Sequence, residues 1–467
     1  MTKVVFAPKA GFTVIPPVKA MINIGACLDI PVGTYIKGKR GENILNGGLG
    51  SLTGVVGIGN NFKTTIALYM MFAAMARILN SSANEYDTEI NVHEWHVREL
   101  LLAIKEFFNE DIIDSGRFEI TDKTIQFGGA WWDKLKGFLQ EKIKNNKQLE
   151  VFTPFINREK TDFLKIIIPT FTLVDSLSEF ITEDVVKMQD ANLLGDSGAN
   201  TVQMRQGLQK NRFLQEIPGL AGGAYNYTLF TAHIGEQIAM DPYSPPAKKL
   251  QYLKGMKIKG VPDKFTFLMN NCWWAHNATP LVHKETKTPL YPRNKEDRQT
   301  GDTDLNVVSL LQLRSKSGKA GAYVELVVSQ NEGVLPSLTE FHYIKTSENF
   351  GLGGNNINYY LELLPDVNLS RTTVREKIDN DEKLQRALNI TAELCQLFEY
   401  HRSRYEDLLC TPKELYDDLK ALGYDWNVLL DTRGFWVLES DDRFKPFLST
   451  MDLLEMRKGL YKPYWMT

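Results

Sequence analysis

The chain has 467 residues, a net charge of −3 and an apolar content of 43%, which predict a soluble protein of two or three domains with a large core. This charge balance excludes a protein that is basic over its whole surface, so a nucleic-acid site must be a local patch. Four cysteines without C-x-x-C spacing, no signal peptide and no apolar stretch of membrane-spanning length indicate a cytoplasmic protein without zinc or disulfide framework.

Three regions are expected along the chain. Residues 1–45 are rich in Pro and Gly and predict a loop-rich N-terminal segment. Between residues 46 and 350, apolar strand runs alternate with helical stretches, which predicts an α/β domain with a mainly parallel sheet. The region 351–467 is predicted to be a mostly helical domain. Its first residues, 351–356, are rich in Gly and Asn and predict a linker.

The segment 57–65 predicts a phosphate-binding loop between a strand and an apolar helix. It fits the pattern G-x-x-x-x-G-K-[ST], except that Phe62 occupies the place of the second glycine. Backbone amides would hold phosphates, Lys63 would reach the outer phosphates, and the Thr64 hydroxyl would bind Mg²⁺. The expected nucleotide contacts are Gly57, Ile58, Gly59, Asn60, Asn61, Phe62, Lys63, Thr64 and Thr65. The alternative is an ordinary strand-to-helix turn that contains a lysine.

Two carboxylates are expected beside this loop. Glu89, in the acidic run after the loop helix, could stand at the tip of the adjacent strand and polarise the attacking water. Asp175 follows the apolar run 165–174, expected to form one strand, and is the predicted partner of Thr64 in binding Mg²⁺. The long stretch between the two acids could contain an inserted hairpin formed by residues 149–155 and 163–168. A surface acidic turn and a strand-end cap are the simpler alternatives.

A further expected strand, 227–232, leads to a histidine and a lysine-rich segment. His233 could sense the γ-phosphate and transmit its presence to the residues that follow, although a lone histidine is more often structural. Residues 247–264 combine lysines, Tyr252 and glycines with one acid, a composition that suits a loop following a nucleic-acid backbone. The expected DNA contacts are Lys248, Lys249, Lys254, Lys257 and Lys259. A solvated basic loop is the alternative, and the run 264–268 is predicted as a strand.

In order and spacing, these motifs resemble the RecA family of recombinases, and the phage UvsX-type branch in particular, with which the Phe-Lys pair of the loop is shared. The resemblance covers about residues 20–345. It implies a RecA-type P-loop ATPase core that uses ATP and Mg²⁺, with Glu89, Lys63 and His233 as catalytic residues. It also implies a first DNA-binding loop at 195–197, followed by a helix that offers Arg205, Lys210 and Arg212. Arg314 and Lys316 resemble a basic pair that reaches the nucleotide of the neighbouring subunit.

The implied function is that of an ATP-dependent DNA recombinase. Such a protein would assemble as a homo-oligomeric filament on single-stranded DNA, with duplex DNA left open as a second partner, and promote homologous pairing and strand exchange. A membrane partner is not expected, and a phage-encoded protein would act in the host cytoplasm. Two alternatives remain: a hexameric RecA-type replicative helicase, and a nucleotide-gated loader or structural protein with little turnover. Phe62 motivates the last, because it lacks the backbone freedom of glycine.

Overall fold

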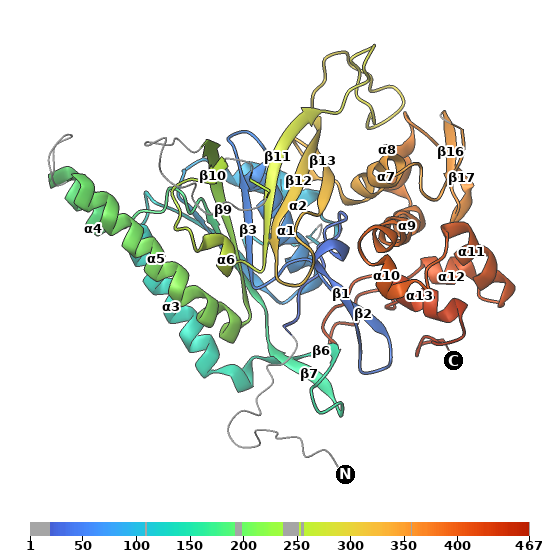
Figure 1. The fold of residues 1–467 in the computed structure, drawn as a ribbon, viewed down its shortest axis with the longest axis horizontal. Coiled ribbons are helices and arrows are strands. Elements are labelled where there is room, and N and C mark those ends of the chain that lie inside the picture. The colour runs from blue at the N-terminus through green and yellow to red at the C-terminus, as the bar shows by residue number, and fades with distance from the viewer. Residues whose placement is uncertain are drawn as a thin grey trace, which may run out of the picture.

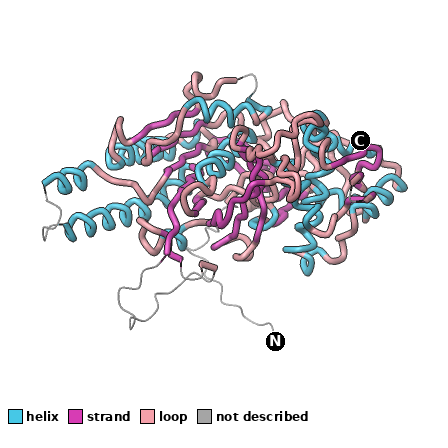
Figure 2. Tube along the Cα trace, turned by 90° about the horizontal axis from the view of Figure 1, so that it is seen from above, coloured by secondary structure: helices cyan, strands magenta, loops and turns pink. Residues whose placement is uncertain are grey.

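A computed structural model describes residues 19–107, 110–191, 199–236, 252–253, 256–355 and 357–466. A large mixed sheet forms the centre of the described molecule, with helices on both of its faces (Figures 1 and 2). Within these ranges, no helix has both the length and the apolar character needed to cross a membrane.

The central sheet is parallel over most of its width, as the sequence predicts. Its strands lie in the order β14-β13-β12-β11-β3-β9-β8-β4-β5, and β10 pairs with the end of β9. Neighbours from β11 to β5 are parallel, whereas β12, β13, β14 and β10 are antiparallel to their partners. The strands are β3 (Leu52–Gly57), β4 (Ser82–Asp87), β5 (Phe118–Asp122), β8 (Thr170–Asp175), β9 (Asn226–Glu236), β10 (Met256–Ile258), β11 (Asn271–Pro280), β12 (Leu305–Ser315), β13 (Tyr323–Ser329) and β14 (Gly333–Val334).

Helices bury both faces of the parallel strands, which explains why these strands read as continuous apolar runs. On β3, Val55 joins the core beneath α1, while Val56 joins the core on the opposite face. That opposite core is closed by α3, α5 and α6, and α3 to α5 lie together at one side of the sheet (Figure 1). The helices of this part are α1 (Lys63–Arg77), α2 (Glu94–Leu102), α3 (Gly128–Lys144), α4 (Glu183–Ala191), α5 (Ala199–Ala224), α6 (Phe265–Leu268) and α7 (Pro336–Thr346).

The N-terminal segment packs against the C-terminal region. Gln396 Nε2 donates to the Cys27 carbonyl (2.8 Å) and Trp436 Nε1 donates to the Met21 carbonyl (2.9 Å). One continuous hydrophobic core joins this segment, the sheet and the C-terminal helices, so the three predicted regions do not have separate cores. The remaining elements are β1 (Thr34–Lys37), β2 (Asn43–Asn46), β6 (Glu150–Ile156), β7 (Phe163–Ile167), β15 (Leu352–Gly354), β16 (Asn358–Leu361), β17 (Leu364–Ser370), α8 (Val374–Asn380), α9 (Glu382–Tyr400), α10 (Arg402–Tyr405), α11 (Pro412–Ala421), α12 (Trp426–Leu430) and α13 (Thr450–Arg457).

Three local predictions were wrong and one was confirmed. The run 264–268 contains a short helix, α6, and the strand in this region is β11. The run 165–174 is divided between β7 and β8, because Pro169 separates them and cannot donate to a ladder. The predicted linker 351–356 contains β15 of a three-stranded antiparallel sheet. The inserted hairpin is confirmed, since β6 and β7 pair antiparallel.

Candidate nucleotide site

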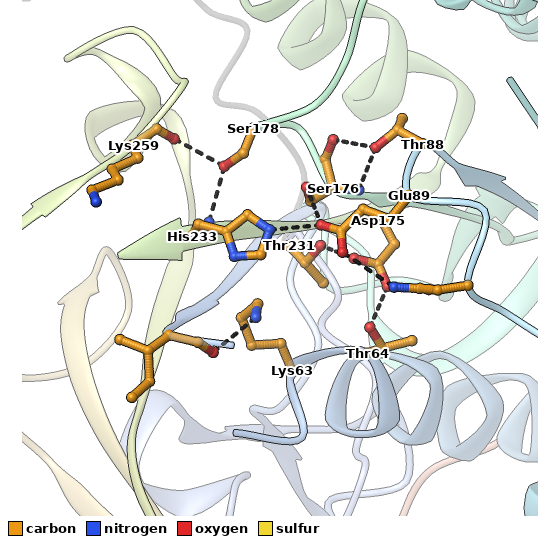
Figure 3. Close-up of polar contacts among 12 residues, drawn as sticks. Lys63, Thr64, Thr88, Glu89, Asp175, Ser176, Ser178, Thr231, His233 and Lys259 are labelled. Atoms are coloured by element: carbon orange, nitrogen blue, oxygen red, sulfur yellow. Dashed lines mark hydrogen bonds and ion pairs between the residues drawn. The ribbon is translucent and has the colours of Figure 1, made fainter. Parts of the chain in front are cut away.

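The predicted phosphate loop, both carboxylates and His233 meet where parallel strands β3, β4, β8 and β9 end (Figure 3). We call this place the carboxyl edge of the sheet. Register explains the convergence, because Gly57 pairs with His233 while Asp87 pairs with Asp175. Ligands of open parallel sheets bind at this edge, so the structure brings the sequence-predicted site residues to the place where a nucleotide site is expected.

The loop between β3 and α1 is held in a compact shape. Lys63 Nζ donates to the Ile58 carbonyl (2.9 Å), and Asn61 Nδ2 donates to the Ala275 carbonyl on β11 (3.0 Å). Phe62 has φ +56°, in the left-handed region where the phosphate-loop pattern has glycine. A Cβ at Gly57 would lie 2.9 Å from the Ala275 carbonyl oxygen, which requires glycine there. The loop therefore has its expected strand-loop-helix setting, despite the phenylalanine.

Lys63 is buried, and its surroundings favour an additional anion. Burial lowers its pKa, and the charges of Glu89 and Asp175 offset this effect only in part. The ammonium lies at the first residue of α1, where backbone N–H groups and the helix dipole also attract negative charge. A phosphate beside Lys63 would be stabilised by both effects, so this loop fits a nucleotide.

Asp175 joins the loop to the centre of the sheet. Its carboxylate accepts hydrogen bonds from the hydroxyls of Thr64, on α1, and Thr231, on β9 (Figure 3). Burial raises the pKa of Asp175, and the two hydroxyls oppose that rise. A hydroxyl and a carboxylate in contact are oxygen ligands of the kind that Mg²⁺ prefers. A bound cation would also relieve the cost of ionising Asp175, so Thr64 and Asp175 fit the predicted metal.

Glu89 stands beside these groups on a turn built by Asp87. The Asp87 carboxylate accepts the backbone N–H groups of residues 89–92 at 2.8–2.9 Å and so fixes the turn. Glu89 Oε1 accepts from Ser176 Oγ (2.7 Å) and lies 2.7 Å from His233 Nε2. Burial opposes ionisation of Glu89, but the bonds from Ser176 and His233 and the Lys63 charge lower its pKa overall. An ionised carboxylate is thus held at the carboxyl edge, as a general base requires.

His233 also connects this edge with β10. Its backbone N–H donates to Ser178 Oγ (2.9 Å), whose hydroxyl donates to the Lys259 carbonyl (2.9 Å; Figure 3). The Lys259 N–H returns a hydrogen bond to the His233 carbonyl (2.7 Å). Because Lys257 and Lys259 are exposed on β10 and directly after it, the histidine is linked to the described part of the lysine-rich segment.

The predicted DNA contacts differ in their exposure to solvent. Arg205 and Arg212 are exposed on α5. Lys210 is buried, and its ammonium donates to the carbonyls of Ser178 (2.5 Å) and Gly260 (2.7 Å). Lys210 is therefore not available to a phosphate. Although it lies between Arg205 and Arg212 in the sequence, it is on the buried side of α5. Lys248, Lys249, Lys254 and the loop 195–197 lie outside the described residues.

Arg314 and Lys316 lie far from the loop of their own chain. Arg314 pairs with Cys272, which in turn pairs with Gly54, and Lys316 follows at the level of Leu52 where β3 begins. The loop follows the other end of β3, roughly 10 Å along the strand from the level of Arg314 and roughly 16 Å from the level of Lys316. In this chain Lys316 Nζ donates to the Leu268 carbonyl (2.9 Å), and the Arg314 guanidinium lies 5.6 Å from the Phe267 ring centroid.

Sequence reasoning identified the Thr64 hydroxyl but missed those of Ser176, Ser178 and Thr231. Thr231 precedes His233 by two residues, so strand alternation places both side chains on one face, and that period could have identified it. Ser178 has no comparable signal, because its partners come from distant parts of the chain.

Within the described residues no group of three or more His, Cys, Asp or Glu side chains could hold a metal ion. The candidate magnesium site accordingly consists of one hydroxyl and one carboxylate from the protein, as is usual when phosphates and water supply the other ligands. Comparison of the chain with protein-family models and with curated proteins finds no match.

Proposed function

We propose that the chain is an ATP-dependent DNA recombinase with a RecA-type core, which assembles on single-stranded DNA. The observation that carries the ATPase part is the contact of Thr64, Asp175 and Thr231 beside Glu89 and Lys63 at one edge of a parallel sheet. Such a site combines an ammonium and amides for phosphates, oxygen ligands for Mg²⁺, and an ionised carboxylate for the attacking water.

Each residue has a defined task in this proposal. Lys63 and the N–H groups at the start of α1 neutralise the phosphates, and bound ATP with Mg²⁺ supplies the reacting phosphoryl group. Thr64 and Asp175 would hold the cation. Glu89 accepts a hydrogen bond from the attacking water and withdraws its proton, and Ser176 and His233 keep the carboxylate in place.

The DNA part of the proposal is supported by the position of the exposed basic residues. Lys257 and Lys259 accompany β10, which pairs with the strand of His233, and Arg205 and Arg212 lie on α5. Basic side chains near a nucleotide-sensing residue allow ATP and DNA to favour the same conformation, which is the requirement for coupled binding.

Nucleotide binding is tested with a Mg²⁺-dependent ATP-analogue titration of the wild type, Lys63→Ala and Lys147→Ala. Lys147 is an exposed lysine outside the site, so its variant controls for loss of a surface charge. We expect the wild type and Lys147→Ala to bind alike and Lys63→Ala to lose binding. Equal binding by a folded Lys63→Ala protein would remove the nucleotide site.

Assembly is tested by electron micrographs of the protein with single-stranded DNA and a slowly hydrolysed ATP analogue. Helical filaments are expected for a recombinase. Closed rings would favour the helicase alternative, and dispersed particles with little turnover would favour the loader. Affinity for single-stranded DNA should also fall steeply with salt, by about 0.7 in log K per unit log salt for each phosphate contact. The Lys257→Ala/Lys259→Ala double variant should flatten that slope by roughly one unit or more.

A further inference from the structure

Lys210 is a buried lysine that the nucleotide site does not use. It is only 3% exposed, and it crosses from α5 to two backbone carbonyls, those of Ser178 after β8 and Gly260 after β10. Removing the ammonium from water costs desolvation free energy, and burial lowers the pKa of Lys210 to about 8. No apolar side chain could donate to these two carbonyls, so the ammonium gives Lys210 a specific linking function.

The segments that Lys210 joins approach each other unusually closely. Gly260 has φ +67°, and a Cβ there would lie 2.7 Å from the Ser178 carbonyl oxygen. The side chain of Ser178 simultaneously accepts the His233 N–H and donates to the Lys259 carbonyl. We call these five residues, Ser178, Lys210, His233, Lys259 and Gly260, the Ser178 node.

We infer that Lys210 is a positioning residue that locks α5 and β10 together through the Ser178 node, so that both basic segments respond jointly to the nucleotide site. Three elements meet there. His233 contacts Glu89 of the nucleotide site. Lys259 and Gly260 directly follow β10. Lys210 belongs to α5, which also carries the exposed Arg205 and Arg212. The joint response rests on the proposed function, whereas the mechanical link does not.

The mechanical link is tested first, without nucleotide or DNA, by amide hydrogen exchange on the full chain. Lys210→Met keeps most of the length of the side chain and removes its donors, leaving the Ser178 and Gly260 carbonyls without this partner. The amides of His233 and Lys259 should then exchange at least about 5-fold faster, because local opening of this node becomes easier. Ser178→Ala, which removes the hydroxyl at the same node, should accelerate the same amides.

The matched control is Lys136→Met. Lys136, on α3, forms an ion pair with Glu216 of α5 at 2.6 Å. The control therefore also removes a lysine that holds α5, at a position six residues, or about 9 Å, further along the helix than Lys210. We expect it to leave exchange at His233 and Lys259 unchanged. Unchanged exchange in folded Lys210→Met and Ser178→Ala proteins, or equal acceleration in the control, would overturn the inference.

The joint response is tested by DNA stimulation of ATP turnover. Lys210→Met should retain DNA-independent turnover within about 2-fold and lose about 5-fold or more of the stimulation by single-stranded DNA, the scale of a typical coupling free energy. Ser178→Ala and Lys210→Met together should cost no more than one of them alone, since both break one node. Full stimulation in Lys210→Met would overturn the joint response. A wild type without ATP turnover or DNA dependence would instead refute the proposed function, while the exchange result still decides the link.

Discussion

At the scale of single residues, Phe62 is the main departure from the phosphate-loop pattern. Its left-handed backbone costs roughly 1–2 kcal/mol for a residue with a Cβ. The half-buried side chain also packs against the core, so the phenylalanine both strains and anchors the loop. A comparison that removes the side chain in both variants separates the two effects.

We predict that Phe62→Gly is more stable than Phe62→Ala by about 1 kcal/mol. At an ordinary helical or extended position the order is reversed, because glycine has more freedom in the unfolded chain. Denaturant unfolding of the two variants measures the difference. As a control, the same pair at Phe138, an exposed residue within α3, should favour alanine. Alanine more stable than glycine at position 62 would show that the loop does not require the left-handed conformation.

Glu89 should carry the base function without sharing it with Glu85. Glu85 is fully buried, which raises its pKa well above the usual value and keeps it away from an attacking water. We predict that Glu89→Gln lowers ATP hydrolysis by a factor of about 10²–10⁴ while ATP still binds. Single-turnover hydrolysis and an equilibrium binding titration separate the two steps, and Glu94→Gln, on the exposed start of α2, is the control.

The pH dependence provides an independent check of that assignment. The lowered pKa keeps Glu89 ionised as pH falls, so the acidic limb of the hydrolysis profile should lie below the ordinary glutamate value of about 4.3. A limb between pH 5 and 7 that persists in Glu89→Gln would assign the base to another group.

At the scale of elements, the contact of α7 with α9 contains a carboxyl group that should make stability depend on pH. Glu340 is buried on α7, and Asn389 Nδ2 on α9 donates to its Oε1 (3.1 Å). Burial raises the pKa of Glu340 to about 8, Asn389 opposes the rise, and the charge of Glu393 adds to it. At pH values between the ordinary pKa of a glutamate and about 8, Glu340 therefore holds a proton in the folded protein that it has released in the unfolded chain.

We predict that the free energy of unfolding falls as pH rises from about 5 to 8, by about 1 kcal/mol per unit from this group. Glu340→Gln, which stays neutral, should reduce that slope, and denaturant unfolding at several pH values measures it. Some slope should remain, because burial also raises the pKa of Asp29 to about 7. Exposed Glu376, on α8, supplies the control variant Glu376→Gln. An undiminished slope in Glu340→Gln would show that this carboxyl is ionised in the folded protein.

The elements also show how far the sequence could predict this fold. The convergence of the loop, Glu89, Asp175 and His233 was predictable, because a parallel sheet brings the carboxyl ends of its strands together. The run 264–268 was misassigned because a few apolar residues fit a buried helix as well as a strand. The Ser178 node could not be predicted, because its hydrogen bonds join residues up to 81 positions apart and depend on a close backbone approach at Gly260.

At the scale of the whole molecule, the position of Arg314 and Lys316 determines what they can reach. They lie toward the beginning of β3, whereas the phosphate loop follows its end. Both residues are displaced from the loop along the strand, and Lys316 by nearly its whole length. Their position therefore suits contact with the site of another copy of the chain, in a head-to-tail assembly.

We predict that this pair acts across the subunit boundary. Arg314→Ala/Lys316→Ala and Lys63→Ala proteins should each be inactive alone, because each lacks one half of every site. Mixed in equal amounts, they should regain turnover at about a quarter of the boundaries, where an intact loop meets an intact pair under random head-to-tail mixing. Activity plotted against mixing ratio should peak near equality. As a control, Lys63→Ala mixed with Glu89→Gln should regain nothing, because both changes lie on the same side of the boundary. Co-assembled mixtures that remain inactive at every ratio would show that the pair does not complete a neighbour's site.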